Sequence, residues 1–257
     1  MKPDWLPGEE HEQFTEWTIS QGVIVNGVGP ARFPGRGLGM RATRNINVRA
    51  RVEHILWQEQ AKTLQNGEAM VTVPLKAMFT VNCIPSAFIG KFPDGISVHG
   101  IFAAFLTHGD PEDLEMFDTW RKTWPSRQDF KDSMPLLWPE SVRAAQTNLL
   151  PPSISGRWNS IKEQTPIHDY EAPHQNLLAE QENRLKTAWD TVVSVFPETD
   201  REMFVYHWCI VNTRCFYFLM PGQEPPEDRN DAMALLPFAD YFNHSDVVVC
   251  ILSNPLC

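Results

Sequence analysis

The sequence lacks the features that mark membrane-spanning, secreted and nucleic-acid-binding proteins. It contains no run of about 18 apolar residues, and its first segment, MKPDWLPGEEHEQF, has no apolar signal-peptide core. Positive charge is also scarce, with 22 Lys and Arg against 32 Asp and Glu and a net charge of −10. Because the sequence has no long apolar run, we expect no membrane insertion. Because a phosphate backbone is held by clustered lysine and arginine, we also expect no direct nucleic-acid binding.

Cysteine is uncommon, and its spacing is poor for disulfides. The five cysteines are odd in number and have no C-x-x-C spacing. This pattern is typical of reduced thiols, so we expect a protein of the cytoplasm or the nucleus. Zinc is a competing possibility, because soft nitrogen and sulfur ligands gather in the last quarter of the chain: His207, Cys209, Cys215, His244 and Cys250. Since His207 and Cys209 are two positions apart and would face different sides of a helix, we favour no metal site.

Apolar residues are plentiful, at 42% of 257 residues, enough for the core of one large domain or two modest ones. Turn-forming glycines and β-forming residues predict strands near both ends, over 22–28, 33–40, 67–74 and 232–240. Helical spacing predicts helices between them. The order of strands, a helical block and a further strand predicts an α+β domain with a sheet interrupted by a helical insert.

Three helices are expected in the block, over 111–124, about 175–196 and about 199–218. Asp110 can cap the first of these helices, and Pro197 ends the second. The pattern Thr199-x-x-Glu202 is a capping box for the third. Helical spacing favours core packing, rather than an aromatic cage for methylated lysine, for the tryptophans Trp120, Trp124, Trp158, Trp189 and Trp208.

Five motifs follow one another along the chain: FPGRGLGMRATRNI, GEAMVTVP, MPLLWPESVRAA with LLPPSISGRW, FVYHWCIVNTRCF and ALLPFADYFNHS. In order and wording, this set resembles SET-domain protein methyltransferases of the Rubisco large-subunit methyltransferase type, over roughly positions 22–246. The resemblance implies small twisted β-sheets interrupted by a large helical insert. It predicts an N-terminal extension (1–21), a first part of the SET domain (22–80), a helical insert (81–204) and a second part of the SET domain (205–257).

The activity that the resemblance implies is methylation of a lysine Nε in a protein substrate, with S-adenosylmethionine as the cofactor. The acidic net charge suits a basic substrate such as a histone or a ribosomal protein. Matched by position to the family's motifs, the cofactor-binding residues are Arg36, Gly37, Leu38, Arg214, Asn243 and His244. The same matching places Thr213 and Asp240 on the substrate side.

Simpler structural interpretations remain open for the same residues. An ordinary hairpin turn also explains 36–38. Arg214 needs a partner among apolar neighbours, and a structural ion pair with Asp240 or Glu202 would supply one. A backbone hydrogen bond would satisfy a buried His244. Asp240 is also a suitable cap for the turn after the last strand.

Two departures from the family pattern bear on catalysis. The segment 47–66 inserts about twenty residues between the first loop and the Gly67-Glu68 turn. The tyrosine expected after the Asn-His motif is missing, since the tyrosines stand elsewhere, at Tyr170, Tyr206, Tyr217 and Tyr241. We therefore expect a C-terminally truncated SET domain, without its closure and substrate lobe, whose catalytic tyrosine lies beyond the chain end.

We interpret the insertion and the short tail together as read-through of non-coding sequence in a gene model. Two alternatives to an active methyltransferase stay open. One is a catalytically inactive SET-like module that binds a protein partner through its helical insert. The other is an unrelated α+β protein whose helical block is the functional part.

Overall fold

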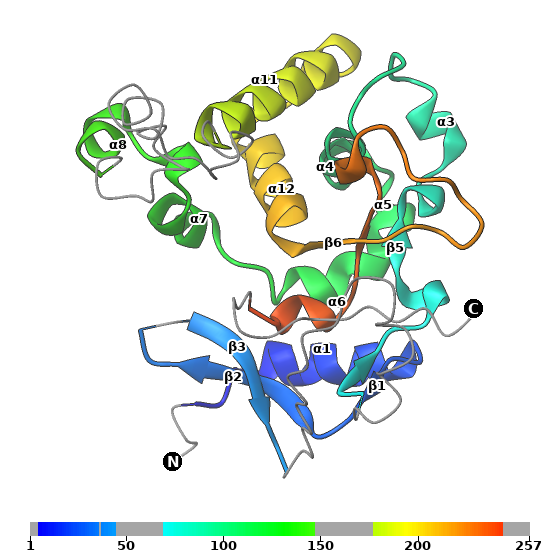
Figure 1. The fold of residues 1–257 in the computed structure, drawn as a ribbon, viewed down its shortest axis with the longest axis vertical. Helices are drawn as coiled ribbons and strands as arrows, with labels where there is room; N and C mark the ends of the chain where they lie inside the picture. The colour runs from blue at the N-terminus through cyan, green and yellow to red at the C-terminus, as the bar shows by residue number, and fades with distance from the viewer. Residues whose placement is uncertain (1–4, 36, 45–68, 147–176, 244–257) are drawn as a thin grey trace, which may run out of the picture. The chain divides into compact units, whose positions relative to one another are not determined.

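The computed structural model describes residues 5–35, 37–44, 69–146 and 177–243 (Figure 1). The chain divides into two compact units. Unit 1 consists of Met1–Met78, Thr119–Thr123 and Leu235–Cys257. Unit 2 consists of Phe79–Asp118 and Trp124–Ala234. The first and last parts of the sequence therefore fold together in unit 1.

The sheets of unit 1 are two antiparallel pairs. β1 (Ile24–Val25) pairs with β4 (Val71–Thr72), and β2 (Val28–Phe33) forms a hairpin with β3 (Gly37–Ala42). Gly35, in the turn of this hairpin, has a φ of 70°, a left-handed conformation that glycine adopts without steric cost. The other described elements of the unit are α1 (Glu9–Ser20), η2 (Leu75–Ala77) and η9 (Ala239–Tyr241).

The core of unit 1 is aromatic and centres on α1. The buried residues of this helix, His11, Phe14 and Thr18, recur at helical spacing and form one face. Phe14 is fully buried, stacks on Trp120 at 5.9 Å between ring centroids, and meets the ring of Tyr241 edge-on at 5.8 Å. Residues far apart in the sequence therefore meet on a single face of α1.

Unit 2 is mainly helical. α4 (Val98–His108) is buried from His99 to Leu106 and packs mainly against α12 (Arg201–Arg214), as expected for a helix that is apolar on all sides. α11 (Leu177–Val195) also contacts both of these helices. The shorter helices are η3 (Val81–Cys83), α3 (Ser86–Ile89), α5 (Pro111–Leu114), η4 (Glu115–Phe117), α7 (Arg127–Ser133), η5 (Pro135–Leu137), α8 (Glu140–Gln146) and η8 (Arg229–Asp231).

A small sheet has the strand order β5-β7-β6, from β5 (Phe79–Thr80), β7 (Met233–Leu235) and β6 (Cys215–Tyr217). The outer strands β5 and β6 come from the two ends of the helical block. The mixture of helices with small sheets confirms the expected α+β class. The finer division at 22–80, 81–204 and 205–257 stays a prediction, and the predicted insertion at 47–66 lies outside the described residues.

Several sequence predictions of helices and buried side chains are confirmed. α11 ends at Val195, two residues before Pro197, although positions 175 and 176 lie outside the described residues. Trp120, Trp124 and Trp208 are buried as core residues. Trp189 is half-buried, and Trp158 lies outside the described part of the chain.

The predicted continuous helix over 111–124 is wrong. The segment breaks into α5, η4 and α6 (Asp118–Arg121), and the Asp110 side chain makes no capping hydrogen bond. Phe117 is buried in unit 2, whereas Trp120 is buried in unit 1. A regular helix with both aromatic residues on one face would direct them to the same core. The break in the helix allows Phe117 and Trp120 to be buried in different cores.

The predicted capping box and end of the third helix are also wrong. Asp200 caps α12, because its carboxylate accepts from the Met203 backbone N–H at 2.7 Å, while the Thr199 hydroxyl donates to the Phe196 carbonyl at 2.6 Å. The helix ends at Arg214, and the next three residues form β6. Aromatic residues with helical spacing thus extend as a strand where a neighbouring strand is present to pair with them.

The strands are shorter than predicted. β3 begins at Gly37 rather than at position 33, and β7 replaces the predicted strand over 232–240. Pro237 cannot donate to a ladder, and Phe238 has a φ of 71°, which no strand accommodates. Asn243 therefore follows η9 rather than the end of a strand.

No helix in the described part of the chain combines the length and the apolar character needed to cross a membrane.

Candidate functional site

The residues predicted to form the first cofactor loop lie where the β2–β3 hairpin turns back. Gly37 has a φ of 74°, and a Cβ added there would meet no atom within 4 Å, so this end of β3 borders open space. Leu38 is half-buried and pairs with Arg32 across the hairpin. Arg36 lies outside the described residues. An exposed backbone at a hairpin turn agrees both with a ligand loop and with an ordinary turn.

Asn243 lies against this hairpin. Its Nδ2 donates to the Leu38 carbonyl oxygen at 3.3 Å, across 205 positions of the sequence. A Cβ added to Gly39 would stand 2.8 Å from the same Nδ2, so glycine allows this close approach. The structure therefore brings together two of the predicted cofactor-binding residues, Leu38 and Asn243. His244 lies outside the described part of the chain.

Asp240 has a packing partner in unit 1. Its Oδ2 accepts from the Trp120 indole N–H at 3.0 Å, which ties η9 to the aromatic core. Phe238, before η9, holds a left-handed conformation that costs a non-glycine residue on the order of 1 kcal/mol. It is fully buried and packs edge-on against Tyr241 at 5.5 Å, so packing maintains the strained turn. A substrate-side role of Asp240 stays a prediction.

Thr213 and Arg214 lie in the last turn of α12, in unit 2. The Thr213 side chain is exposed, and its hydroxyl donates to the Cys209 carbonyl at 2.7 Å within the helix. Glu202 stands at the other end of α12, about 18 Å from Arg214 at 1.5 Å per residue, and forms an ion pair with Arg127 at 3.5 Å. The proposed Arg214–Glu202 pair is therefore excluded. The cofactor role of Arg214 and the substrate role of Thr213 stay predictions.

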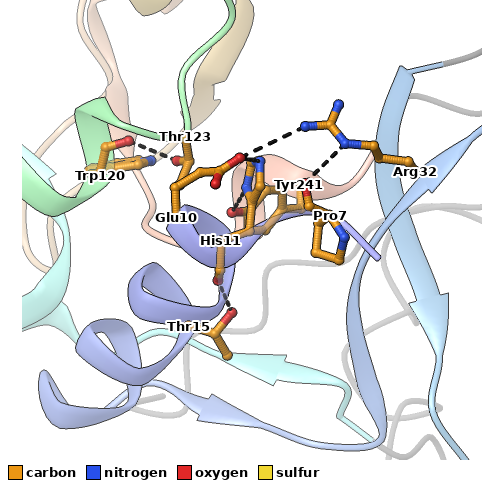
Figure 2. A network of polar contacts seen from close by, with 8 residues as sticks. All are labelled: Pro7, Glu10, His11, Thr15, Arg32, Trp120, Thr123 and Tyr241. Atoms are coloured by element: carbon orange, nitrogen blue, oxygen red, sulfur yellow. Dashed lines mark hydrogen bonds and ion pairs between the residues drawn. The ribbon is translucent and has the colours of Figure 1, made fainter. Parts of the chain in front are cut away.

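A buried polar network beside η9 has no signal in the sequence (Figure 2). His11 Nδ1 lies 2.7 Å from the Tyr241 hydroxyl oxygen, across 230 positions of the sequence. The other ring nitrogen, Nε2, lies 3.5 Å from Glu10 Oε1. Both rings are buried, with 3% of His11 and 5% of Tyr241 exposed. No local pattern marks either residue, because only the folded chain brings them together.

Unit 2 holds a second polar cluster, around His99. Its Nε2 lies 3.6 Å from Cys215 Sγ, and its Nδ1 lies 3.5 Å from an Arg184 nitrogen. Burial, and then the nearby Arg184 charge, lower the pKa of His99 to about 4. Burial raises the pKa of the Cys215 thiol. Both groups are therefore neutral near pH 7, which suits a structural contact better than a thiolate nucleophile.

The residues weighed for zinc are separately engaged in the described part of the chain. His207 Nδ1 lies 2.9 Å from the Thr107 hydroxyl, and Cys215 contacts His99. Burial raises the pKa of Cys209 to about 11. No three histidine, cysteine, aspartate or glutamate side chains are grouped for a metal ion within the described ranges, and His244 and Cys250 fall outside them.

Comparison with known proteins supports a SET-domain family for this chain. The sequence is 23% identical over 242 residues to "SET domain-containing protein 4" of Mus musculus, and 19% identical over 245 residues to "SET domain-containing protein 4" of Homo sapiens. Each alignment covers 92% of this chain but 47% of the relative, so the chain spans about half the length of these relatives. No family model matches the sequence.

Proposed function

We propose that this protein binds S-adenosylmethionine and methylates the Nε of a lysine in a protein substrate, as a SET-domain enzyme of the Rubisco large-subunit methyltransferase type. The acidic net charge of −10 favours a basic substrate, such as a histone or a ribosomal protein. The reduced-thiol pattern of the cysteines favours the cytoplasm or the nucleus as its location.

One observation carries the proposal: Asn243 donates to the backbone of Leu38. The five motifs of the resemblance place these two residues at the cofactor, and they are 205 positions apart in sequence. In an unrelated fold, a contact between the motif that contains Leu38 and the motif that contains Asn243 would not be expected. The open space beside Gly37 and the close approach allowed by Gly39 support a ligand-binding hairpin at the same place.

The residues present suit the chemistry of the cofactor's amino-acid end. An asparagine amide has both donor and acceptor groups. Because Nδ2 of Asn243 is directed to Leu38, the amide plane is fixed and its carbonyl oxygen can accept from the ammonium group of the cofactor. In this arrangement, backbone groups of Gly37 and Leu38 would also contact the cofactor. S-adenosylmethionine, when bound, supplies a methyl group on a sulfonium, and the protein's task is to align it with a lysine nitrogen.

Cofactor binding is the first test. Isothermal titration of the 257-residue chain with S-adenosylmethionine and S-adenosylhomocysteine should give a saturable signal. Asn243→Ala should weaken binding about tenfold, the size expected for loss of one well-placed polar contact. Asn230→Ala is the matched control, because this exposed asparagine bonds locally to Asp228. Failure of the folded, unaltered chain to bind either ligand would refute the proposal.

Methyl transfer is the second test. The chain is incubated with S-adenosylmethionine carrying a labelled methyl group and with histone or ribosomal protein mixtures, and labelled lysine is sought by mass spectrometry. A signal that Asn243→Ala lowers, and Asn230→Ala leaves unchanged, supports catalysis by this chain.

An inactive SET-like module that binds a partner through its helical insert is the second candidate. Two tyrosine hydroxyls in the described ranges already have structural partners: Tyr206 donates to the Pro125 carbonyl at 3.1 Å, and Tyr241 bonds to His11. Both hydroxyls are thus occupied in packing rather than available to orient a lysine. Cofactor binding without methyl transfer would favour this candidate.

A further inference from the structure

We propose that His11 is a positioning residue for Asn243, acting through Tyr241 to fix the turn that carries the asparagine onto the hairpin. The functional part of this role rests on the proposed cofactor site at Leu38 and Asn243. The structural part concerns only the contacts of unit 1.

The neighbouring Glu10 favours one direction for the His11–Tyr241 hydrogen bond. Glu10 lies 3.5 Å from His11 Nε2, and a carboxylate only accepts hydrogen bonds, so it favours the tautomer with the proton on Nε2. Nδ1 is then an acceptor, and the Tyr241 hydroxyl donates to it across 2.7 Å (Figure 2). A short hydrogen bond between two buried rings stands in a low-dielectric environment, where its loss leaves a polar group unsatisfied.

The segment that leads into α1 is tied to the same hairpin that receives Asn243. The Arg32 backbone N–H donates to the Trp5 carbonyl at 2.9 Å. The Arg32 Nε donates to the Pro7 carbonyl at 3.0 Å (Figure 2). An Arg32 nitrogen also lies 3.8 Å from Glu10 Oε1. Arg32 pairs with Leu38 in the strand register, and Leu38 accepts from Asn243.

These contacts form a closed ring. It runs from Asn243 to Leu38, across the hairpin to Arg32, through α1 to His11, and from His11 to Tyr241, two residues before Asn243. The helix therefore holds both chain segments that meet at the proposed cofactor site. The conformation of η9 depends on its tertiary contacts, because Phe238, the residue before it, is held in a left-handed conformation by packing.

The test combines cofactor affinity with a probe of Asn243 that needs no cofactor. Titration with S-adenosylmethionine compares the unaltered chain with His11→Ala and Tyr241→Phe, each expected to bind about tenfold more weakly. His11→Asn should restore most of the affinity, because its amide oxygen can accept where Nδ1 does. The side-chain amide resonances of Asn243, followed by NMR without ligand, should shift in His11→Ala and Tyr241→Phe and return in His11→Asn.

Thr18→Val is the matched control. Thr18 is fully buried in the same helix, and its hydroxyl donates to the Phe14 carbonyl at 2.6 Å, within α1. This substitution removes a buried polar contact of α1 and leaves the Tyr241 hydroxyl and its partner in place, so affinity should change by less than about twofold and the Asn243 resonances should stay in place. This control separates positioning from a general loss of stability.

The outcomes separate the two proposals. Unshifted Asn243 resonances in His11→Ala, or an equal effect of Thr18→Val, would overturn the positioning role even if the chain binds the cofactor. If the resonances shift as expected but the unaltered chain does not bind the cofactor, the proposed function fails, while the positioning of Asn243 by His11 stands.

Discussion

At the scale of single residues, glycine decides how closely chain segments approach around α1. Gly8, the N-cap residue of this helix, has a φ of 127°, and a Cβ added there would clash with Glu10 Oε1. Glycine adopts this backbone conformation without strain and leaves room for the Glu10 carboxylate to fold back toward His11. The Glu10 side chain therefore depends on Gly8 for its place in the network.

Gly8→Ala should lower the free energy of unfolding by about 1–2 kcal/mol, measured by urea denaturation. The new methyl group meets both an unfavourable φ and the Glu10 carboxylate. Gly95→Ala is the control, because Gly95 also has a positive φ, of 90°, but a Cβ there would meet nothing within 4 Å. Equal losses in the two variants would contradict a specific conflict with Glu10.

Cysteine reactivity should follow burial among the three described thiols. Cys83 is exposed, whereas burial raises the pKa of Cys209 to about 11 and also raises the pKa of Cys215. Because the thiolate is the reactive form, brief alkylation of the folded protein at pH 8 should modify Cys83 well before the other two. Peptide mass mapping checks the order, with urea-unfolded protein as the control. Labelling of Cys209 at the rate of Cys83 would contradict the buried placement of α12.

At the scale of elements, two adjacent residues, Thr199 and Asp200, could each cap the N-terminus of α12. The sequence offers Thr199 with Glu202, and Asp200 with Met203. The structure uses Asp200, because the Thr199 hydroxyl is occupied by the Phe196 carbonyl and also lies 2.8 Å from His108 Nε2. A tertiary contact therefore decides which residue is left to cap the helix.

Asp200→Ala should cost about 1 kcal/mol of stability, because the Met203 backbone N–H loses its acceptor at the helix N-terminus. Glu202→Ala should cost less than about 0.5 kcal/mol, since this exposed side chain forms a surface ion pair with Arg127. Thermal and urea denaturation measure both variants. A larger loss for Glu202→Ala than for Asp200→Ala would restore the capping box that the sequence suggested.

At the scale of the whole molecule, a buried neutral histidine couples the stability of the protein to pH. His99 is 5% exposed, and its pKa is lowered from 6.5 to about 4 by burial and by Arg184. The unfolded chain binds a proton at this residue at a higher pH than the folded chain does. Its stabilising contribution is therefore complete above pH 6.5 and is lost as the pH falls from 6.5 to about 4.

Replacing His99 should flatten this part of the pH profile. Between pH 7 and pH 4 the unaltered protein should lose about 3 kcal/mol more stability than His99→Gln, measured by urea denaturation at each pH. His108, whose pKa burial also lowers, is present in both proteins, so the difference isolates His99. The charged neighbours Arg184 and Asp228 also remain in both. Parallel pH profiles would show that His99 is not buried in its neutral form.

Local sequence patterns correctly predicted the structural features that depend on residues close together in the sequence. The α+β class, the position of α11, and the core tryptophans Trp120, Trp124 and Trp208 follow from apolar spacing and from Pro197. The predictions were wrong where distant segments compete for the same residues. The helix over 111–124 breaks because its aromatic residues serve two units, and the end of the third helix becomes β6 beside β7.

For the candidate site too, the sequence predicted single residues but not the contacts between them. Leu38 and Asn243 were predictable from motifs, because each motif is short and continuous in the sequence. Their contact, and the His11–Tyr241 bond behind it, span 205 and 230 positions, and no pattern of spacing links residues so far apart. Arg36 and His244 lie outside the described ranges, and the cofactor roles of Leu38 and Asn243 likewise stay predictions.

By itself, the sequence determined the class of fold, the reduced-thiol pattern, the acidic charge and the order of motifs that resemble a SET domain. These are local or additive properties, which survive in the unfolded chain. Only the tertiary structure decided that Asn243 lies on the Leu38 backbone, that Asp240 bonds to Trp120, and that His11 bonds to Tyr241. Such contacts require segments from opposite ends of the chain to be buried together, and burial is a property of the folded molecule.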